Sequence, residues 1–175
     1  MATSWHETGA AGEGLSEIDR RVRGALDALG VEYTAVPCDP DLADTAAFCA
    51  TYGYDTGDSA NTIIVQTRDK PPRHVACVLL ATTRLDVNGT VRRRLGRKSS
   101  FADAQSTIEL TGMTLGGVTA VGLPPGLPLW IDSRVMARDR VILGAGSRSW
   151  KIIAPPGFLA ILPGAEVVEG LARPA

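Results

Sequence analysis

The sequence contains few of the residues on which metal sites and disulfide frameworks depend. Its 175 residues include two histidines, His6 and His74, and three cysteines, Cys38, Cys49 and Cys77. The cysteines are odd in number, widely spaced and without a CxxC pair, so neither a disulfide framework nor a Cys/His zinc site is expected. We therefore predict a reducing, cytoplasmic environment and no metal.

Long apolar runs, excess basic charge and aromatic residues are also scarce. No apolar run approaches the roughly 20 residues of a membrane helix, and the N-terminus lacks the basic and apolar regions of a signal peptide, so no membrane partner is expected. Eighteen Lys and Arg against 19 Asp and Glu leave a formal net charge of −1. A nucleic acid would therefore have to bind a local patch. Aromatic residues make up only 5%, which disfavours a general RNA-binding protein that stacks bases.

What is present is typical of a globular domain, with 45% apolar and 21% charged residues. Residues 1–15 are small and polar and predict a flexible N-terminal tail. Residues 16–175 have the length of one domain.

Apolar spacing and capping residues predict the helices. Ser16 with Asp19 forms an N-cap pair, and Gly30 stands where a left-handed residue would end the helix. The other expected helices are one closed by Gly53, one ending at Gly96, one capped by Ser100 that runs from Phe101 to about Leu110, and a short one opened by Pro155-Pro156.

Runs rich in β-branched residues predict the strands. Residues 61–67 and 74–81 flank the polar turn RDKPP and are expected to form a hairpin at the centre of a sheet. Further strands are expected at 33–36, 129–131, 141–143 and 150–154.

The most informative segment is a glycine-rich loop, residues 112–122. Adjacent glycines allow a ligand to approach backbone N–H groups, which can serve as an oxyanion hole. A plain glycine-rich connection is the alternative. The segment is neither a P-loop nor a dinucleotide-binding motif, so no cofactor is expected.

A second glycine-rich segment, Gly144-Ala-Gly-Ser-Arg148, follows an apolar strand. It could present backbone donors and the Arg148 guanidinium to an anion. We favour an ordinary hairpin turn, because Gly and Ser dominate such turns.

One strong charge run exists, formed by Arg92, Arg93, Arg94, Arg97 and Lys98. It could contact the phosphates of an RNA. A solvated helix face with cations at the helix C-terminus is at least as good an explanation.

Three isolated polar residues have modest expected roles. Asp132 could polarise a ligand hydroxyl, but we favour a helix cap. Cys77 is expected to be an inert core residue and His74 a surface residue. No Ser/His/Asp order, HExxH motif or paired carboxylates occur in the sequence, so nothing supports a self-sufficient nucleophile or metal hydrolysis.

Taken together, six segments resemble the YbaK family of aminoacyl-tRNA deacylases, whose domain is also inserted in many bacterial prolyl-tRNA synthetases. The likeness covers about residues 16–169. The matching segments are SANTIIVQT, HVACVLLATTRLD, VRRRLG, AQSTIELTGMTLGGVTAVGLP, LWIDSRV and GAGSRSWKI. The resemblance implies an α/β fold with a mixed, mostly antiparallel central sheet flanked by helices.

The resemblance also implies a function, the hydrolysis of the ester of a mischarged aminoacyl-tRNA by a substrate-assisted mechanism. A pocket would hold the tRNA 3′ end, and an aminoacyl-tRNA synthetase is a possible partner. Gly116 and Gly117 match the family's glycine pair beside the ester, and Thr119 stands where a serine is usual. Implied substrate-binding residues are Thr62, Gly122, Asp132, Gly144, Gly146, Ser147 and Arg148.

This chain departs from the family pattern at Asn61-Thr62, where the family has a Lys-Thr pair. Losing a charge-assisted hydrogen bond costs roughly 1.5 to 3 kcal/mol, or about 10- to 150-fold in rate. A proline usual after the serine is also replaced, by Ala120. Asn61 is therefore a catalytic position that leaves two hypotheses open. One is an editing hydrolase, and the other is a weakened or inactive module that binds aminoacyl-tRNA, a nucleotide or a protein.

Overall fold

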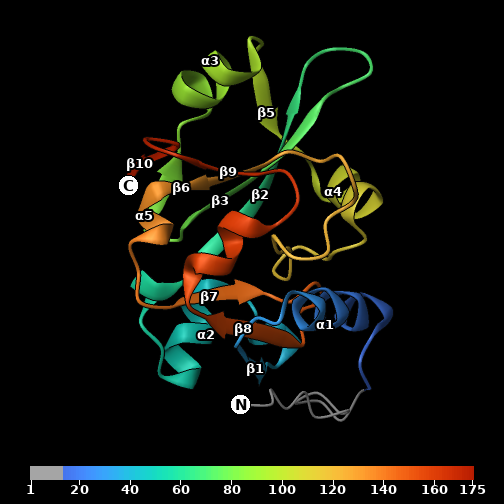
Figure 1. Cartoon of the computed structure of the whole chain (residues 1–175), viewed down its shortest axis with the longest axis vertical. Helices are drawn as coiled ribbons and strands as arrows, with labels where there is room; N and C mark the ends of the chain where they lie inside the picture. The colour runs from blue at the N-terminus through green and yellow to red at the C-terminus, as the bar shows by residue number, and fades with distance from the viewer. Residues whose placement is uncertain (1–13) are drawn as a thin grey trace.

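The centre of the molecule is a five-stranded sheet in the order β5-β2-β3-β6-β9 (Figure 1). The computed structural model describes residues 14–175. The strands of this sheet are β2 (Ala60–Thr67), β3 (His74–Leu80), β5 (Ser99–Phe101), β6 (Leu129–Asp132) and β9 (Ala165–Val168).

The expected central hairpin is confirmed. Strands β2 and β3 pair antiparallel from Ala60↔Leu80 to Gln66↔His74. On either side of them the sheet is mixed, because β2 pairs antiparallel with β5, whereas β3–β6 and β6–β9 are parallel.

The remaining strands do not join this sheet. A three-stranded antiparallel sheet has the order β1-β8-β7, and β10 pairs with β4. Their bounds are β1 (Thr34–Pro37), β7 (Val141–Gly144), β8 (Trp150–Ala154), β4 (Thr83–Leu85) and β10 (Ala172–Pro174). The mixed α/β class is confirmed, and its strands divide among three sheets.

The first helix, α1 (Glu17–Leu29), has both predicted ends. Ser16 Oγ accepts from the Asp19 N–H while the Asp19 carboxylate accepts from the Ser16 N–H, and Gly30 closes the helix with φ 64°. The other helical segments are η1 (Pro40–Leu42), α2 (Thr45–Tyr52), η2 (Thr56–Asp58), η3 (Val87–Val91), α3 (Arg92–Leu95), α4 (Ala104–Thr111), α5 (Ser133–Met136) and η4 (Pro156–Ile161).

The prediction that Ser100 caps a helix is wrong. Ser100 lies in β5 opposite Gln66, where the sheet holds its backbone extended. The helix α4 begins three residues later than Phe101, and its cap is Asp103, whose Oδ1 accepts from the Ser106 N–H at 2.7 Å. Within residues 14–175, no helix combines the length and apolar character needed to cross a membrane.

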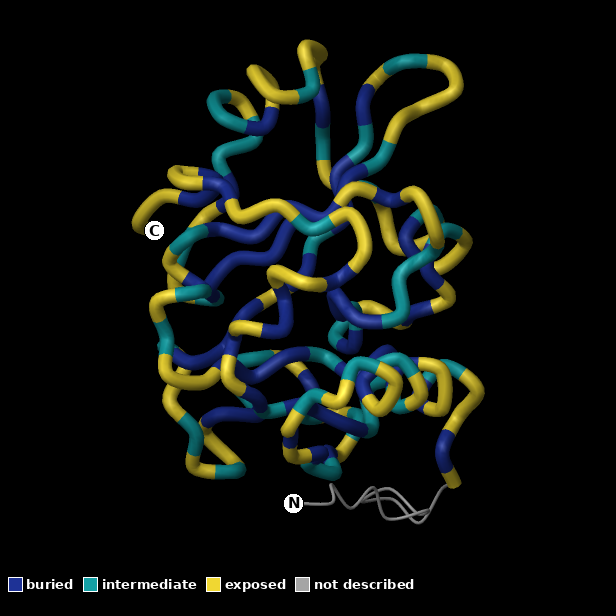
Figure 2. The backbone as a smooth tube through the Cα atoms, in the orientation of Figure 1, coloured by how far each residue is buried: buried dark blue, intermediate teal, exposed yellow. Residues whose placement is uncertain are grey.

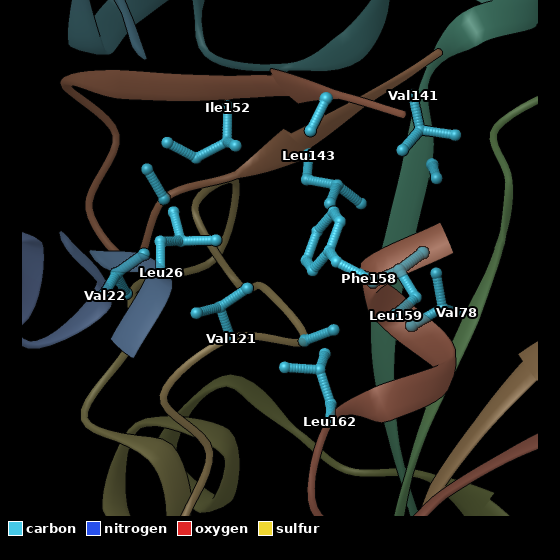
Figure 3. Packing of buried hydrophobic residues seen from close by; sticks show 14 of the residues in the cluster. Val22, Leu26, Val78, Val121, Val141, Leu143, Ile152, Phe158, Leu159 and Leu162 are labelled. Carbon is cyan, nitrogen blue, oxygen red and sulfur yellow. The ribbon is translucent and has the colours of Figure 1, made fainter. Parts of the chain in front are cut away.

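The largest apolar core of the described residues lies between the five-stranded sheet, the three-stranded sheet, α1 and η4. Leu143 and Ile152 of the three-stranded sheet face Phe158 of η4, with Leu26 of α1 beside them (Figure 3). Leu15, which we predicted to belong to the tail, is buried in this core. Leu15 therefore belongs to the packed domain rather than to the predicted tail, of which residues 1–13 lie outside the described part.

An ion cluster fixes the chain just before β2. Asp58 accepts from Arg138 Nη2 at 2.6 Å and from Arg140 Nε at 3.0 Å. The hydrogen bond from Arg138, and then that from Arg140, lowers the pKa of the Asp58 carboxyl, against the opposing effect of burial.

We expect Asp58→Asn to lower the free energy of unfolding at pH 7 by on the order of 1 kcal/mol, because it removes the charge that both guanidinium groups bind. Since the folded pKa is the lower one, the wild-type advantage is complete above the unfolded pKa of about 4 and is lost as pH falls through the folded value. Urea unfolding of both proteins across this range measures it. A difference that does not shrink in acid would contradict the prediction.

Candidate functional site

A cavity of about 280 Å³ lies between α2, the start of β2, the loop 112–122 and the three-stranded sheet. Its lining is partly apolar, with Phe48 and Ile142 among the wall residues. The polar lining residues are Asp44, Thr45, Ser59, Asn61, Thr62 and Lys151, and Gly116 and Gly144 contribute backbone.

The two glycine-rich segments form one side of this region, and they bind each other directly. The Gly146 N–H donates to the Gly117 carbonyl at 2.7 Å, and the Thr114 N–H donates to the Gly146 carbonyl at 3.0 Å. Segments about 30 positions apart in sequence are thereby held side by side.

This contact requires two residues without a Cβ. A Cβ on Gly144 would lie 2.6 Å from the Val118 carbonyl oxygen, and one on Gly117 would lie 2.9 Å from the Gly146 carbonyl oxygen, with Ser147 closer still. Real Cβ atoms essentially never approach backbone below 3.0 Å. The glycines are thus explained by close packing of backbone on backbone.

The expectation that both segments offer free amides needs correction. The Gly117 N–H donates to the Thr114 carbonyl at 2.8 Å, and the Gly146 N–H is used as described above. The Gly116 N–H is different, since no partner for it is found within the described chain. Gly116 is also the one of these three glycines that lines the cavity.

Asn61 and Thr62 lie together in the cavity wall at the start of β2. Asn61 is exposed, and its Oδ1 accepts from Thr45 Oγ1 at 3.3 Å. Thr62 is buried, and its Oγ1 has no hydrogen-bond partner among residues 14–175. A buried hydroxyl without a partner beside a cavity is available to a bound polar group.

Lys151 is the cavity residue that sequence reasoning missed. It is 7% exposed, its Nζ donates to the Gly116 carbonyl at 3.0 Å, and it lies 5.7 Å from the centre of the Phe48 ring. Burial lowers the pKa of the Lys151 ammonium, because desolvation disfavours the charged form. A lone cation within the apolar strand WKIIA was the only available signal.

Arg148 and Ser147 support the loop from outside the cavity lining. Arg148 Nε donates to the Pro40 carbonyl at 2.7 Å, and its Nη1 contacts Asp44 at 3.2 Å and the Leu115 carbonyl at 3.1 Å. Ser147 Oγ accepts from the Ser149 N–H at 3.2 Å. Both side chains are engaged in holding the turn.

Three other predicted site residues do not line the cavity. Thr119 is fully buried, and its Oγ1 has no partner within the described residues. Gly122 borders a separate, mostly apolar groove of about 570 Å³ beside α1. Asp132 is fully buried and caps α5, with Oδ1 accepting from the Arg134 N–H at 3.0 Å and Oδ2 from the Ala172 N–H at 2.7 Å. The cap interpretation is therefore confirmed.

The basic run lies at the other end of the molecule, on α3 and beside β5 (Figure 1). Arg94 is engaged, stacking 4.7 Å from the Trp130 ring centre and pairing with Glu166. The residues there are largely exposed (Figure 2), and Arg92, Arg97 and Lys98 line a shallow depression together with Arg68.

The cysteines and His74 stay outside the cavity lining. Burial raises the pKa of Cys77 to about 12, which agrees with an inert core thiol. Over residues 14–175, no three His, Cys, Asp or Glu side chains form a group that could hold a metal ion.

The chain is similar in sequence and in structure to proteins of a known family. A family profile described as "Aminoacyl-tRNA editing domain" matches residues 39–155, more than half of the chain. A crystal structure of a candidate trans-editing enzyme for prolyl-tRNA synthetase is similar, with a TM-score of 0.77 and 26% identity over 89% of this chain and 98% of that one. The crystal structure of hypothetical protein APE2540 is also similar, with a TM-score of 0.78 and 25% identity over 87% and 99% of the two chains.

We expect Gly117→Ala to lower the free energy of unfolding by about 1 to 3 kcal/mol, because the added methyl must displace backbone carbonyls of residues 146 and 147. Gly24→Ala is the matched control. Gly24 lies within α1, where an added methyl would meet no other atom within 4 Å, so the same change there should be neutral or stabilising by up to about 1 kcal/mol. Urea unfolding of both variants measures the difference. Equal stabilities would contradict the tight contact.

Proposed function

We propose, from the premise that the chain belongs to the aminoacyl-tRNA editing domain family, that this protein hydrolyses the ester of a mischarged aminoacyl-tRNA. The cavity would receive the tRNA 3′ end with its amino acid. The observation that carries the proposal is the cavity itself, which gathers Asn61, Thr62, Gly116 and Gly144 from three separate parts of the sequence.

The reaction we propose needs no side-chain nucleophile. Water adds to the ester carbonyl carbon while a neighbouring ribose hydroxyl of the substrate relays its proton. The bond from the carbonyl carbon to the ribose oxygen then breaks, the ribose oxygen takes up the proton, and the free amino acid leaves. Among the described lining residues there is no histidine, which fits a proton relay through the substrate.

Each lining residue has a proposed role. The Thr62 hydroxyl and the Asn61 amide would bind polar groups of the substrate, and the Gly116 N–H would donate to the ester. Gly117, Gly146, Ser147 and Arg148 would act indirectly, by holding the loop against the turn. Phe48, Ile142 and Ile63 would limit the size of the amino acid that enters.

The second function retains the fold without catalysis, as a module that binds aminoacyl-tRNA, a nucleotide or a protein partner. Two observations favour it: Asn61 carries no charge, and the amides of Gly117 and Gly146 are already bonded within the chain. An aminoacyl-tRNA synthetase is a proposed partner of the protein, whether it is a hydrolase or a binding module.

We expect the purified protein to deacylate at least one member of a panel of mischarged tRNAs above the buffer rate. Leu115→Trp should reduce this rate at least tenfold, because Leu115 is a half-exposed lining residue and a larger side chain would fill the cavity mouth. Ile161→Trp, at an exposed residue away from the lining, is the matched control. Ester loss at the buffer rate across the whole panel would refute the hydrolase.

Asn61→Lys separates the two functions. If only the variant deacylates, the natural chain is a binding module. We expect both to be active, because the cavity already contains a cation. Initial rates on the same panel give the answer.

We further propose that Arg92, Arg93, Arg97 and Lys98 contact tRNA phosphates. These four side chains are exposed, although Arg97 also lies 3.6 Å from Asp69 and Arg93 donates to Thr90. Arg94 would contribute least, because Trp130 and Glu166 hold it.

We expect Arg92→Gln to weaken tRNA binding and to reduce the slope of log affinity against log salt by about 1, since one phosphate contact is lost. Arg23→Gln, on the distant helix α1, should leave the slope unchanged. Filter binding at several salt concentrations measures both. Identical slopes for the two variants would rule out this contact.

A further inference from the structure

Lys151 supplies a positive charge to the cavity from an unexpected strand. It lies in β8 between Trp150 and Ile152, whose side chains are buried in the main core on the other face of the sheet. Lys151 instead points toward α2 and the cavity. It is the only Lys, Arg or His among the cavity-lining residues that the structure describes.

The charge of Lys151 is poorly compensated within the protein. Within residues 14–175 its one hydrogen bond goes to the neutral Gly116 carbonyl. Asp44 is the only carboxylate among the described lining residues, but its side chain is 75% exposed and already pairs with Arg148. A buried ammonium without a close carboxylate opposes folding, and an apolar side chain of similar size would pack there at less cost. Its contacts with the Gly116 carbonyl and the Phe48 ring hold it in place but do not neutralise its charge.

We propose that Lys151 is a catalytic residue whose ammonium group stabilises the oxyanion formed on the substrate carbonyl, an inference that rests on the proposed hydrolysis. An ammonium group has three donors, and the Gly116 carbonyl uses one. The other two are available to an oxygen in the cavity. The cation that Asn61 cannot provide thus comes from β8.

Lys151 neither gains nor loses a proton during the reaction. As water adds to the carbonyl carbon, the π electrons move onto the carbonyl oxygen, which then accepts hydrogen bonds from Lys151. When the bond to the ribose oxygen breaks, the electrons return and the carbonyl re-forms. The interaction strengthens as negative charge develops, so it accelerates the reaction more than it tightens substrate binding.

This role requires the protonated lysine. Burial acts most strongly against the charge of Lys151, and Arg148 also disfavours it. The Asp44 carboxylate favours it, whereas the Cys38 and Cys49 thiols favour it only when they are ionised, and burial raises the pKa of Cys38. Because burial lowers the Lys151 pKa, the enzymatic rate above background should fall as pH rises through that lowered value.

The test compares Lys151→Gln and Lys151→Met with wild type. Gln keeps an N–H donor for Gly116 and removes the charge, whereas Met removes both. Two quantities are measured: the single-turnover deacylation rate on the best panel substrate, and the Kd of a 3′-aminoacylamino-adenosine analogue carrying the same amino acid through a stable amide. Arg23→Gln controls for loss of one positive charge elsewhere, and thermal melts identify any variant that does not fold.

We expect both Lys151 variants to lose about 100-fold in rate while the analogue Kd changes less than threefold. A Gln variant within threefold of the wild-type rate would overturn the proposal, because Lys151 would then only position Gly116. Equal losses in rate and in Kd would also overturn it, because Lys151 would then bind the ground state. Neither of these two results would contradict the proposed hydrolase activity. A wild type inactive on every substrate would instead refute the proposed function, and the oxyanion role with it.

Discussion

The candidate site depends on the direct contact between two glycine-rich segments. The hydrogen bond from Gly146 to Gly117 and the missing Cβ atoms at Gly117 and Gly144 allow the loop 112–122 to lie flat against the end of β7. The cavity is the space that remains on the other side of this contact, toward α2 and β2. A side chain at either glycine would separate the two segments and change the shape of the cavity wall.

The same contact determines which polar groups face the cavity. The Gly117 amide donates to Thr114 within its own loop and the Gly146 amide donates to Gly117. Polar groups that remain at the cavity therefore include the Gly116 backbone, the Thr62 hydroxyl and the Lys151 ammonium, in addition to the side chains of Asp44, Thr45, Ser59 and Asn61. An arrangement with one cation in a small, partly apolar space gives that cation a stronger effect than it would have in water. The single ammonium group of Lys151 can therefore interact strongly with a charged or polar group bound in the cavity.

Local signals in the sequence were sufficient for the helix ends and for the central hairpin. Ser16, Asp19 and Gly30 act on atoms within four residues of themselves, so the first helix could be predicted from sequence alone. The division of strands among three sheets could not, because it depends on which distant segments pair. Ser100 illustrates the difference, since it lies in β5 and pairs with Gln66 of β2, and this pairing outweighs its tendency to cap a helix.

For the site, too, the sequence does not reveal contacts between distant segments. The family pattern identified Asn61, Thr62, Gly116 and Gly144, which do line the cavity, but it also indicated Asp132, whose carboxylate is used within the fold. Lys151 gave no clear signal, because a lysine in a short strand usually faces solvent. Only the packing of α2 over the outer face of β8 places it inside, and that packing joins residues about 100 positions apart.

Strand β2 connects the two regions that the proposed substrate would contact. Asn61 stands at the cavity, and Arg68 follows the far end of the strand, where its N–H donates to the Lys98 carbonyl at 3.2 Å. Seven residues of extended chain span roughly 23 Å, which is the length of about seven stacked nucleotides at 3.4 Å each. A 3′ end in the cavity would therefore bring phosphates several nucleotides upstream to the cationic end of the molecule. One strand thus sets the distance between the site that would select the amino acid and the surface that would hold the RNA.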